Sequence, residues 1–395
     1  MKNYSLRGND KSMNILILHA GAELYGADKV LLELLKNIDK SKYKPYVVLP
    51  CDGILVNELK KNKIDVTVIK YPILRRKYFN IMGLIKYIKD YIKYSIKLKK
   101  FAKEKEIDLI HTNTAAVLEG ILLKYILKIP QIWHIHEIIV NPKIMHKVIS
   151  FLIAKNSDEV VTVSNAVANH LNLTGYFKKN INVIYNGVDN NIFNPRNETD
   201  YLKKEFNISD KEIIVGMIGR VNSWKGQNDF IKALDIVIDK HKNVRGILVG
   251  GVFDGEEWRM EELESNIGNL RNKERVIISD YRSDTANVHN LFDIFVLPSI
   301  NPDPLPTVVL EAMATAKPII GYEHGGVCEM VINNFNGYFA KVRDIDDLSC
   351  KICKLIEEKN TRMKFSENSL IRQMEEFSLK SYVRNFEKIY DKYYK

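Results

Sequence analysis

The sequence has few cysteines and no long apolar run, and both absences narrow the class of protein. Four cysteines are scattered among 395 residues, which excludes a disulfide framework and favours a reducing compartment. No stretch of 18 apolar residues occurs, so a membrane-spanning helix is not expected. Residues 1–11 are polar and lack the apolar core of a signal peptide. We therefore expect a protein that stays in the cytoplasm.

A complete set of metal ligands is also missing. Cys350 and Cys353 have the spacing of half a zinc site, but no second pair accompanies them, and the helical periodicity around them favours ordinary packing. Asp344 and Asp346 form an Asp-x-Asp pair, which is a metal motif in some enzymes. Acidic residues are equally expected where a helix begins. Neither a metal nor another cofactor is predicted.

Positive charge is what the chain has in excess, with a formal net charge of +10 at pH 7. Most of it lies in Arg75–Glu106, where eleven basic and three acidic residues give a net charge of +8. Apolar residues recur in this segment at helical spacing, namely Ile81, Leu84, Ile85, Ile88, Tyr91, Ile92 and Ile96. Lysines 86, 89, 93, 97 and 100 occupy other directions around the same helix.

A basic amphipathic helix of this kind can lie on an anionic membrane surface, with Tyr87 and Tyr94 at the lipid interface. Alternatively, the apolar stripe packs on a sheet while the lysines face water. Nucleic acid is not predicted as a partner, because no nucleic-acid-binding motif accompanies the charge. We expect peripheral association with the inner face of a membrane.

Apolar runs alternate with helical patterns along the whole chain, which is typical of doubly wound parallel sheets. Strands are expected in the first half at 13–20, 45–50, 66–69, 109–111, 131–136, 158–163 and 182–185, and in the second half at 213–218, 246–249, 276–279, 294–297 and 318–321. A segment rich in Asn, Asp and Pro, 186–200, reads as a linker. We divide the chain into a tail (1–12), an N-terminal domain (13–190), a C-terminal domain (191–378) and a final helix (379–395).

The stretch Phe295–Lys317 combines an anion site with two carboxylates. Pro306 stands at or near the first position of a helix, Asp303 just before it, and Glu311 two turns further on. The helix N-terminus offers free N–H groups and the positive end of a dipole, which suit a phosphate. A sugar joined to a nucleotide needs this combination of donors for phosphate and acceptors for hydroxyls.

Two places in the first half could also contact a ligand. Gly21 and Gly26 lie in the loop after the first strand and allow close approach of a ligand to the backbone, although a plain tight turn is the alternative. Their spacing is neither that of a dinucleotide site nor that of a Walker loop. His134 and His136 end a strand and share one face of it. A metal there would need a third ligand such as His111, and buried packing is the other alternative.

Four motifs in order resemble those of the retaining glycosyltransferases of GT-B architecture, family 4 (glycosyl transferases group 1). Asp303-x7-Glu311 is similar to the family's Glu-x7-Glu motif, and Gly219-Arg220-x4-Lys225-Gly226 to its diphosphate clamp. Tyr185–Asp189 followed by Phe193 resembles its interdomain Asn-Gly-Val-Asp, and Gly325-Gly326-x-x-Glu329 its Gly-Gly turn. The resemblance extends over residues 13–390.

This resemblance implies two Rossmann-like domains that face a central cleft, with a C-terminal helix that crosses back to the first domain. The first domain would bind an acceptor and the second a UDP- or GDP-linked sugar donor, which is a substrate and not a cofactor. It implies catalytic roles for Asp303, His136 and Glu311, donor binding by Gly219, Arg220, Lys225, Arg282, Thr307, Val308 and Glu311, and an acceptor or phosphate loop at Gly21 and Gly26. Gly325 and Gly326 would let the backbone approach the donor.

Two departures from the family pattern concern the loop before the helix. Asp303 replaces the usual Glu, and Leu305-Pro306 replaces Phe-Gly, which removes one amide donor but leaves those of Thr307 and Val308. The expected function is metal-independent, retaining transfer of a sugar (EC 2.4, hexosyltransferase type) to a hydroxyl of a glycan or lipid-linked acceptor. A nucleotide-sugar epimerase of the same shape is one alternative, against which the clamp argues. A catalytically inactive nucleotide-sugar-binding subunit of a polysaccharide-assembly complex is another, favoured by Asp303 alone.

Overall fold

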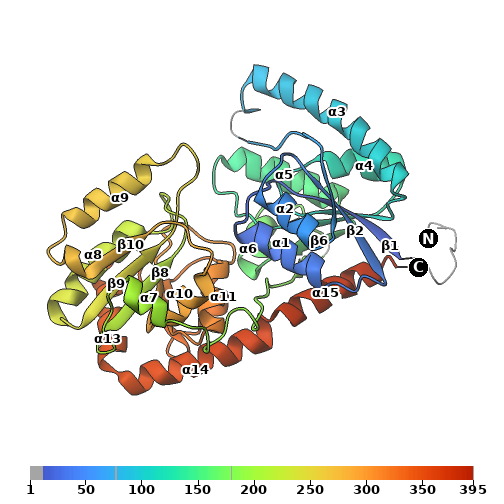
Figure 1. Cartoon of the computed structure of the whole chain (residues 1–395). Helices are drawn as coiled ribbons and strands as arrows, with labels where there is room; N and C mark the ends of the chain where they lie inside the picture. Colours follow the sequence, from blue (N-terminus) through green and yellow to red (C-terminus); the bar gives the residue numbers. More distant parts are fainter. Residues whose placement is uncertain (1–11, 76–77, 179, 395) are drawn as a thin grey trace. The chain divides into compact units, whose positions relative to one another are not determined.

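The computed structural model describes residues 12–75, 78–178 and 180–394. The chain forms two compact units (Figure 1), one made of the residues up to Asn186 together with those from Leu379 onward, and the other of Gly187–Ser378. Each unit is built on its own parallel sheet, of seven strands in the first and six in the second. This is the doubly wound architecture that the alternating apolar runs predicted.

The sheet of the first unit has the strand order β3-β2-β1-β4-β5-β6-β7. Its strands are β1 (Met13–Leu18), β2 (Tyr43–Leu49), β3 (Asp65–Val68), β4 (Leu109–Thr112), β5 (Gln131–Ile135), β6 (Glu159–Thr162) and β7 (Asn182–Val183). Every residue of β1 is buried, because helices cover both faces of the sheet. This explains why the strand reads as a continuous apolar run.

Seven helices are described in the first unit: α1 (Gly26–Asn37), α2 (Ile54–Lys61), α3 (Ile81–Glu104), α4 (Glu119–Leu127), α5 (Lys143–Asn156), α6 (Asn165–Asn172) and α15 (Leu379–Asp391). One face of the sheet buries residues of α1, α2 and α15, and the other buries residues of α3 and α4. The final helix α15 therefore completes the core of the first unit. Its Tyr390 ring lies 5.5 Å from that of Tyr43.

The sheet of the second unit has the order β10-β9-β8-β11-β12-β13. Its strands are β8 (Ile213–Ile218), β9 (Val244–Val249), β10 (Val276–Ser279), β11 (Ile294–Leu297), β12 (Ile319–Tyr322) and β13 (Gly337–Ala340). Its helices are α7 (Asp200–Glu205), α8 (Gln227–Lys240), α9 (Trp258–Gly268), α10 (Thr285–Leu291), α11 (Thr307–Ala314), α12 (Val327–Met330), α13 (Ile345–Glu357) and α14 (Lys359–Glu376). The sequence patterns did not predict β13.

Both sheets reverse their winding direction at one point, between β1 and β4 in the first unit and between β8 and β11 in the second. Loops that leave neighbouring strands in opposite directions open a crevice at the carboxyl edge of the sheet, where α/β proteins bind ligands. Gly21 follows β1, Gly219 follows β8, and Asp303 follows β11. Three residues selected from the sequence therefore lie in loops at these two points.

No helix in the described part of the chain is both long enough and apolar enough to cross a membrane. Asp344 proves to be the N-cap of α13, and its side chain accepts a hydrogen bond from the Asp347 N–H at 2.9 Å. The Asp-x-Asp pair thus has the helix-start role that the sequence favoured.

Candidate functional site

The loop Gly219–Gly226 connects β8 to α8 and carries both residues of the expected diphosphate clamp. A Cβ atom added at Gly219 would meet no atom within 4 Å, so the backbone there is open to a ligand. The Arg220 guanidinium lies 3.4 Å from the centre of the Phe253 ring. At Gly226, φ is +83° and a Cβ would be 1.9 Å from the Pro298 carbonyl oxygen, so only glycine fits. This contact fixes the clamp loop against the loop that follows β11.

Lys225 and Asp303 form an ion pair with Nζ 2.5 Å from Oδ2. Their side chains are only 15% and 14% exposed, so water screens the pair weakly. The Ser299 hydroxyl donates to the same carboxylate oxygen at 3.1 Å. The structure thus brings the clamp lysine directly to the first carboxylate of the Asp-x7-Glu motif.

Helix α11 begins at Thr307, and Pro306 occupies the position before it. The amides of Thr307 and Val308 therefore lie in the first turn, where a helix has no internal acceptor for them. Glu311 follows one turn later and is 5% exposed. Its Oε2 lies 3.1 Å from Nε2 of the buried His289 on α10. No local pattern in the sequence indicated His289, because only the fold brings α10 to α11.

The two glycines of the Gly-Gly turn serve the protein's own backbone. Gly325 has φ +66°, and a Cβ at Gly326 would be 2.0 Å from the Pro304 carbonyl oxygen. The Gly326 N–H also donates to the Asp303 carbonyl oxygen at 2.7 Å. The loop before α11 takes the space that a Cβ would need at both positions, so the packing of this loop requires the two glycines. They hold Asp303 in place.

Arg282 was expected to bind the donor. Its guanidinium instead contacts two carboxylates, with Nη1 2.5 Å from Glu205 Oε1 and Nη2 2.8 Å from Asp284 Oδ2. The hydrogen bond from Arg282 is the largest cause that lowers the pKa of Asp284 to about 2. The residue thus links α7 to the loop before α10, and its contacts in this structure are those of a structural residue.

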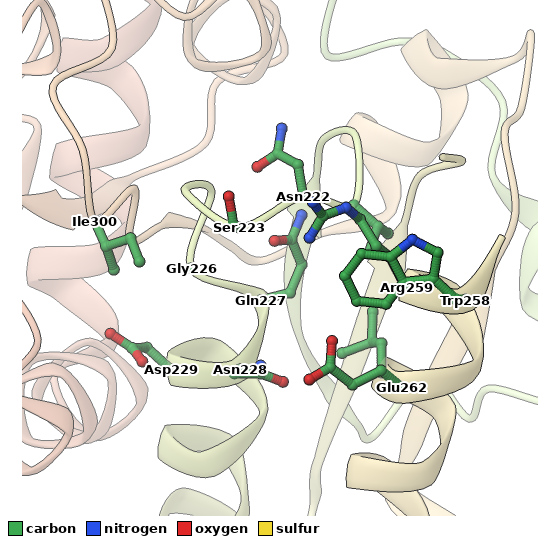
Figure 2. Close-up of a pocket in the computed structure, with 12 residues that line it drawn as sticks. Asn222, Ser223, Gly226, Gln227, Asn228, Asp229, Trp258, Arg259, Glu262 and Ile300 are labelled. Atoms are coloured by element: carbon green, nitrogen blue, oxygen red, sulfur yellow. The ribbon is translucent and has the colours of Figure 1, made fainter. Parts of the chain in front are cut away.

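A pocket of about 380 Å³ opens beside the clamp loop in the second unit. Figure 2 shows Asn222, Ser223 and Gln227 on one side of it, and Trp258 and Arg259 of α9 on the other. The lining is largely polar and includes the first turn of α8. Neither Lys225 nor Asp303 contributes to it. The pocket is therefore lined by other residues of the clamp loop and does not include the Lys225–Asp303 ion pair.

In the first unit, His134 and His136 converge as the strand alternation predicted, with ring centres 4.0 Å apart. Asn113 Oδ1 lies between them, 2.8 Å from His134 Nδ1 and 3.0 Å from His136 Nε2. His111 turns its Nδ1 to the Tyr390 hydroxyl at 2.7 Å. Among the described residues no group of three His, Cys, Asp or Glu side chains is arranged to hold a metal. Burial lowers the pKa of His111 and of His136 to about 3, so both rings are neutral.

The loop after β1 differs from its prediction at one glycine. A Cβ at Gly21 would meet only Asp28 Oδ1, at 3.7 Å, so the backbone there remains accessible. Gly26, by contrast, was expected in the loop but is the first residue of α1. The helix begins there because the Asp28 carboxylate accepts from the Tyr25 N–H at 2.9 Å and caps the helix. Gly26 is therefore part of the helix and not of the loop.

Two buried polar residues that were not predicted, His19 and Asn113, each stand directly after a strand. His19 follows β1 directly and Asn113 follows β4, just as the predicted His136 follows β5. These strands are neighbours in the sheet, so the first residues after them meet at its carboxyl edge. A search for polar residues directly after adjacent predicted strands would have found His19 and Asn113.

Two parallel-sheet units, each with polar loops at the reversal point of its sheet, define a protein of the GT-B architecture. Residues 25–191 match the family described as Glycosyltransferase Family 4, and residues 198–372 match Glycosyl transferases group 1. Together the two matches span most of the sequence. The chain belongs to this family of glycosyltransferases.

Among similar proteins, an uncharacterised glycosyltransferase of Methanocaldococcus jannaschii is 30% identical over 62% of this chain and 61% of its own length. The UDP-Gal:α-D-GlcNAc-diphosphoundecaprenol α-1,3-galactosyltransferase of Escherichia coli is 25% identical over 83% of this chain and 87% of its own. The crystal structure of Anabaena HepE in complex with UDP and glucose has a TM-score of 0.83, with 24% identity, over 96% of this chain and 99% of that one. This last similarity concerns the fold.

Proposed function

We propose that the protein is a retaining glycosyltransferase that moves a sugar from a UDP- or GDP-linked donor to a hydroxyl of a glycan or lipid-linked acceptor. One observation carries this proposal. Lys225, Asp303, Glu311 and the N-terminus of α11 gather at the carboxyl edge of the second sheet, where it reverses direction. Cationic groups for a diphosphate thus stand beside carboxylates for sugar hydroxyls.

The basic and the acidic residues of the site have different proposed roles. Lys225 and Arg220 compensate the negative charge of the diphosphate, and the Thr307 and Val308 amides add hydrogen-bond donors at the positive end of the α11 dipole. As the sugar departs, these groups stabilise the charge that develops on the leaving phosphate. Glu311 accepts hydrogen bonds from the ribose hydroxyls, and Asp303 faces the sugar that is transferred.

In the proposed reaction, the bond between the anomeric carbon and the diphosphate oxygen breaks, and a bond to the acceptor oxygen forms on the same face. The proton of the acceptor hydroxyl passes to the leaving phosphate. No dedicated protein base is assigned. The retaining outcome rests on the similarity of Asp303-x7-Glu311 to the family motif.

A lipid-linked acceptor is supported by the surface of the first unit. Helix α3, an uninterrupted helix in Figure 1, buries Tyr87, Ser95, Leu98 and Ala102 against the first unit. The apolar stripe noted in the sequence lies roughly a quarter-turn away from this face. Its isoleucines and leucine, with Met82, are between 49% and 80% exposed (Ile81, Met82, Leu84, Ile85, Ile88, Ile92, Ile96). The alternative that this stripe packs on the sheet is therefore wrong.

Basic residues border the exposed stripe, among them the exposed Lys86, Lys89, Lys93 and Lys97. Helix α5 of the same unit also carries exposed apolar side chains, namely Ile144, Val148 and Phe151. A bilayer with anionic headgroups matches both the apolar and the cationic part of this surface. Tyr87, however, is buried and cannot reach a lipid interface as expected. We propose that α3 holds the protein on the inner face of a membrane, next to a lipid-linked acceptor.

A panel of nucleotides and nucleotide-sugars tests the function. A true donor at about 100 times its dissociation constant adds roughly 2.7 kcal/mol to stability and raises the thermal midpoint. We expect one UDP- or GDP-sugar to stabilise the protein and then to be hydrolysed slowly or transferred to an acceptor. Binding without any turnover would instead support the inactive subunit. Conversion of the donor into its epimer would support the epimerase.

A further inference from the structure

A chain of hydrogen bonds joins buried polar side chains across the carboxyl edge of the first sheet. It begins at Asp28 on α1, whose Oδ1 lies 2.6 Å from His19 Nε2. Asn113 Nδ2 lies 3.1 Å from His19 Nδ1, and Asn113 Oδ1 contacts both His134 and His136. All are buried except His136, which is partly exposed. This series of hydrogen bonds thus leads from the protein interior to the imidazole ring of His136, which is accessible to a ligand.

The order of donors and acceptors in this chain follows from its first member. Because the Asp28 carboxylate only accepts, His19 carries a proton on Nε2. Its Nδ1 lies 3.1 Å from Asn113 Nδ2 and 3.3 Å from the Asn113 carbonyl oxygen, and with the single ring proton on Nε2 it accepts from the Nδ2 amide. This orientation turns Asn113 Oδ1 toward His134 and His136. Asn113 Oδ1 is then a shared acceptor for both rings, for His134 through Nδ1 and for His136 through Nε2.

The neighbouring rings agree with this assignment. His136 Nε2 also lies 3.2 Å from His134 Nδ1, but its distance to Asn113 Oδ1 is shorter, at 3.0 Å, and with a proton on both nitrogens this oxygen is their common acceptor. A neutral imidazole has one donor and one acceptor nitrogen. The acceptor nitrogen of His134 is buried without a partner among the described residues. Only His136 can offer its acceptor nitrogen, Nδ1, to a ligand.

We propose that Asn113 is a positioning residue that holds His136 with its proton on Nε2, so that Nδ1 accepts a hydrogen bond from a hydroxyl of the substrate's sugar. Asp28 and His19 fix the Asn113 amide in the required orientation. The inference rests on the proposed function for the identity of the ligand. It assigns His136 to a sugar hydroxyl and excludes a phosphate, because Nδ1 has no proton to donate.

The protonation of His136 can be observed directly in protein labelled with 15N-histidine. Two-bond couplings between ring protons and nitrogens distinguish a protonated from an unprotonated nitrogen, and the spectrum of His136→Gln assigns the signals. We expect a protonated Nε2 and an unprotonated Nδ1 throughout about pH 6 to pH 9, because burial keeps the ring neutral. The opposite tautomer, or a mixture of the two, overturns the proposal.

Two substitutions of Asn113 separate positioning from packing. Asn113→Leu removes the shared acceptor, and we expect mixed tautomers and about a tenfold lower kcat/KM for the nucleotide-sugar, with unchanged affinity for the sugar-free nucleotide. Asn113→Asp keeps an acceptor oxygen and should restore kcat/KM at high pH. Its charge raises the pKa of His136, so activity should fall on acidification as Nδ1 becomes protonated. The other titratable groups near His136 are His19, Asp28, His111, His134 and Glu137.

Asn14 supplies a matched control, because it is a buried asparagine at the opposite, amino end of β1, where it donates to the Lys105 carbonyl oxygen at 2.8 Å. Asn14→Leu should lower stability but leave kcat/KM and the His136 tautomer unchanged. If Asn14→Leu and Asn113→Leu lost kcat/KM equally, Asn113 would contribute only to packing and would not position His136. If no nucleotide-sugar is turned over, the proposed function fails, while the nitrogen signals still decide the tautomer.

Discussion

Lys225 Nζ lies 2.5 Å from Asp303 Oδ2, and both side chains are largely buried. An ammonium has three donors and can therefore contact this carboxylate and a phosphate together. The pair thus connects the proposed site of the leaving diphosphate with the carboxylate that is proposed to face the transferred sugar. Asp303 has a side chain one methylene shorter than the usual Glu, but its carboxylate still contacts the Lys225 ammonium.

Replacement of Lys225 tests this connection. Lys225→Ala leaves the phosphate charge uncompensated and Asp303 without its cation, so kcat/KM should fall at least 100-fold, while Lys225→Arg should lose less. Combined with Asp303→Asn, the two losses should be clearly non-additive, because the residues contact each other. The exposed Lys232 of α8 provides the control, since Lys232→Ala removes the same charge from the unit. Additive losses would mean that the pair does not act together.

Glu311→Gln tests the assignment of this carboxylate to the ribose. A hydrogen bond to a charged group contributes about 1.5–3 kcal/mol, so the loss in kcat/KM should be on the order of 10–100-fold. The amide oxygen can still accept from His289, so the fold should persist. Steady-state kinetics with the identified donor measure the effect, and the exposed Glu264→Gln is the control. Wild-type kinetics in a folded Glu311→Gln protein would remove this residue from the donor site.

The site could be predicted in part because its residues stand close together in sequence. Asp303, Thr307 and Glu311 lie within one loop and helix, whereas His289 reaches Glu311 from a different helix through the fold. Strands such as β11 were evident because burial on both faces leaves a continuous apolar run. Strand β13 was not, because Gly337–Ala340 begins with a glycine and has no β-branched residue, and its pairing with β12 is visible only in the fold.

Helix α3 shows that helical spacing of apolar residues predicts a helix but not which of its faces is buried. The spacing predicted a helix over the basic segment, and α3 (Ile81–Glu104) confirms it. Two stripes, one around Leu98 and one around Ile88, are each apolar enough to be buried. Only the packing partners on β4 and α4 determine that the first is buried and the second is exposed.

Turnover should survive removal of divalent metal ions. Lys225, Arg220 and the α11 amides are proposed to supply the positive charge that a metal provides in other enzymes that use nucleotide-sugars. Transfer rates measured after dialysis against EDTA should equal those before it, and added Mg²⁺ or Mn²⁺ should change them little. Loss of activity on chelation, with recovery on adding a metal, would overturn this view of the clamp.

Stability should depend on pH through Glu119, which is fully buried at the start of α4. Burial raises the pKa of its carboxyl from 4.5 to about 8. The folded state therefore binds a proton that the unfolded state has lost, and this residue's contribution to stability falls as pH rises from about 4.5 to 8, by at most about 1.4 kcal/mol per unit. Glu119→Gln removes that titration.

Thermal midpoints measured from about pH 5 to pH 9 test this prediction. The wild-type midpoint should fall relative to that of Glu119→Gln up to about pH 8 and then remain constant relative to it. The exposed Glu104→Gln serves as the control and should follow the wild type. A constant difference between wild type and Glu119→Gln across the range would show that Glu119 titrates normally.

Binding to anionic vesicles should depend on one side of α3. Changing Lys86, Lys89, Lys93 and Lys97 to Glu reverses the charge beside the exposed stripe, and at roughly 1 kcal/mol per basic residue the partitioning should weaken at least 100-fold. Four exposed lysines elsewhere in the first unit provide a control of equal charge change (Lys40, Lys60, Lys61, Lys63). Co-sedimentation at low and high salt measures both, and binding of the wild type should weaken at high salt. Equal binding by the two reversed proteins would indicate attraction by net charge alone, and failure of the wild type to bind at low salt would contradict a membrane role for α3.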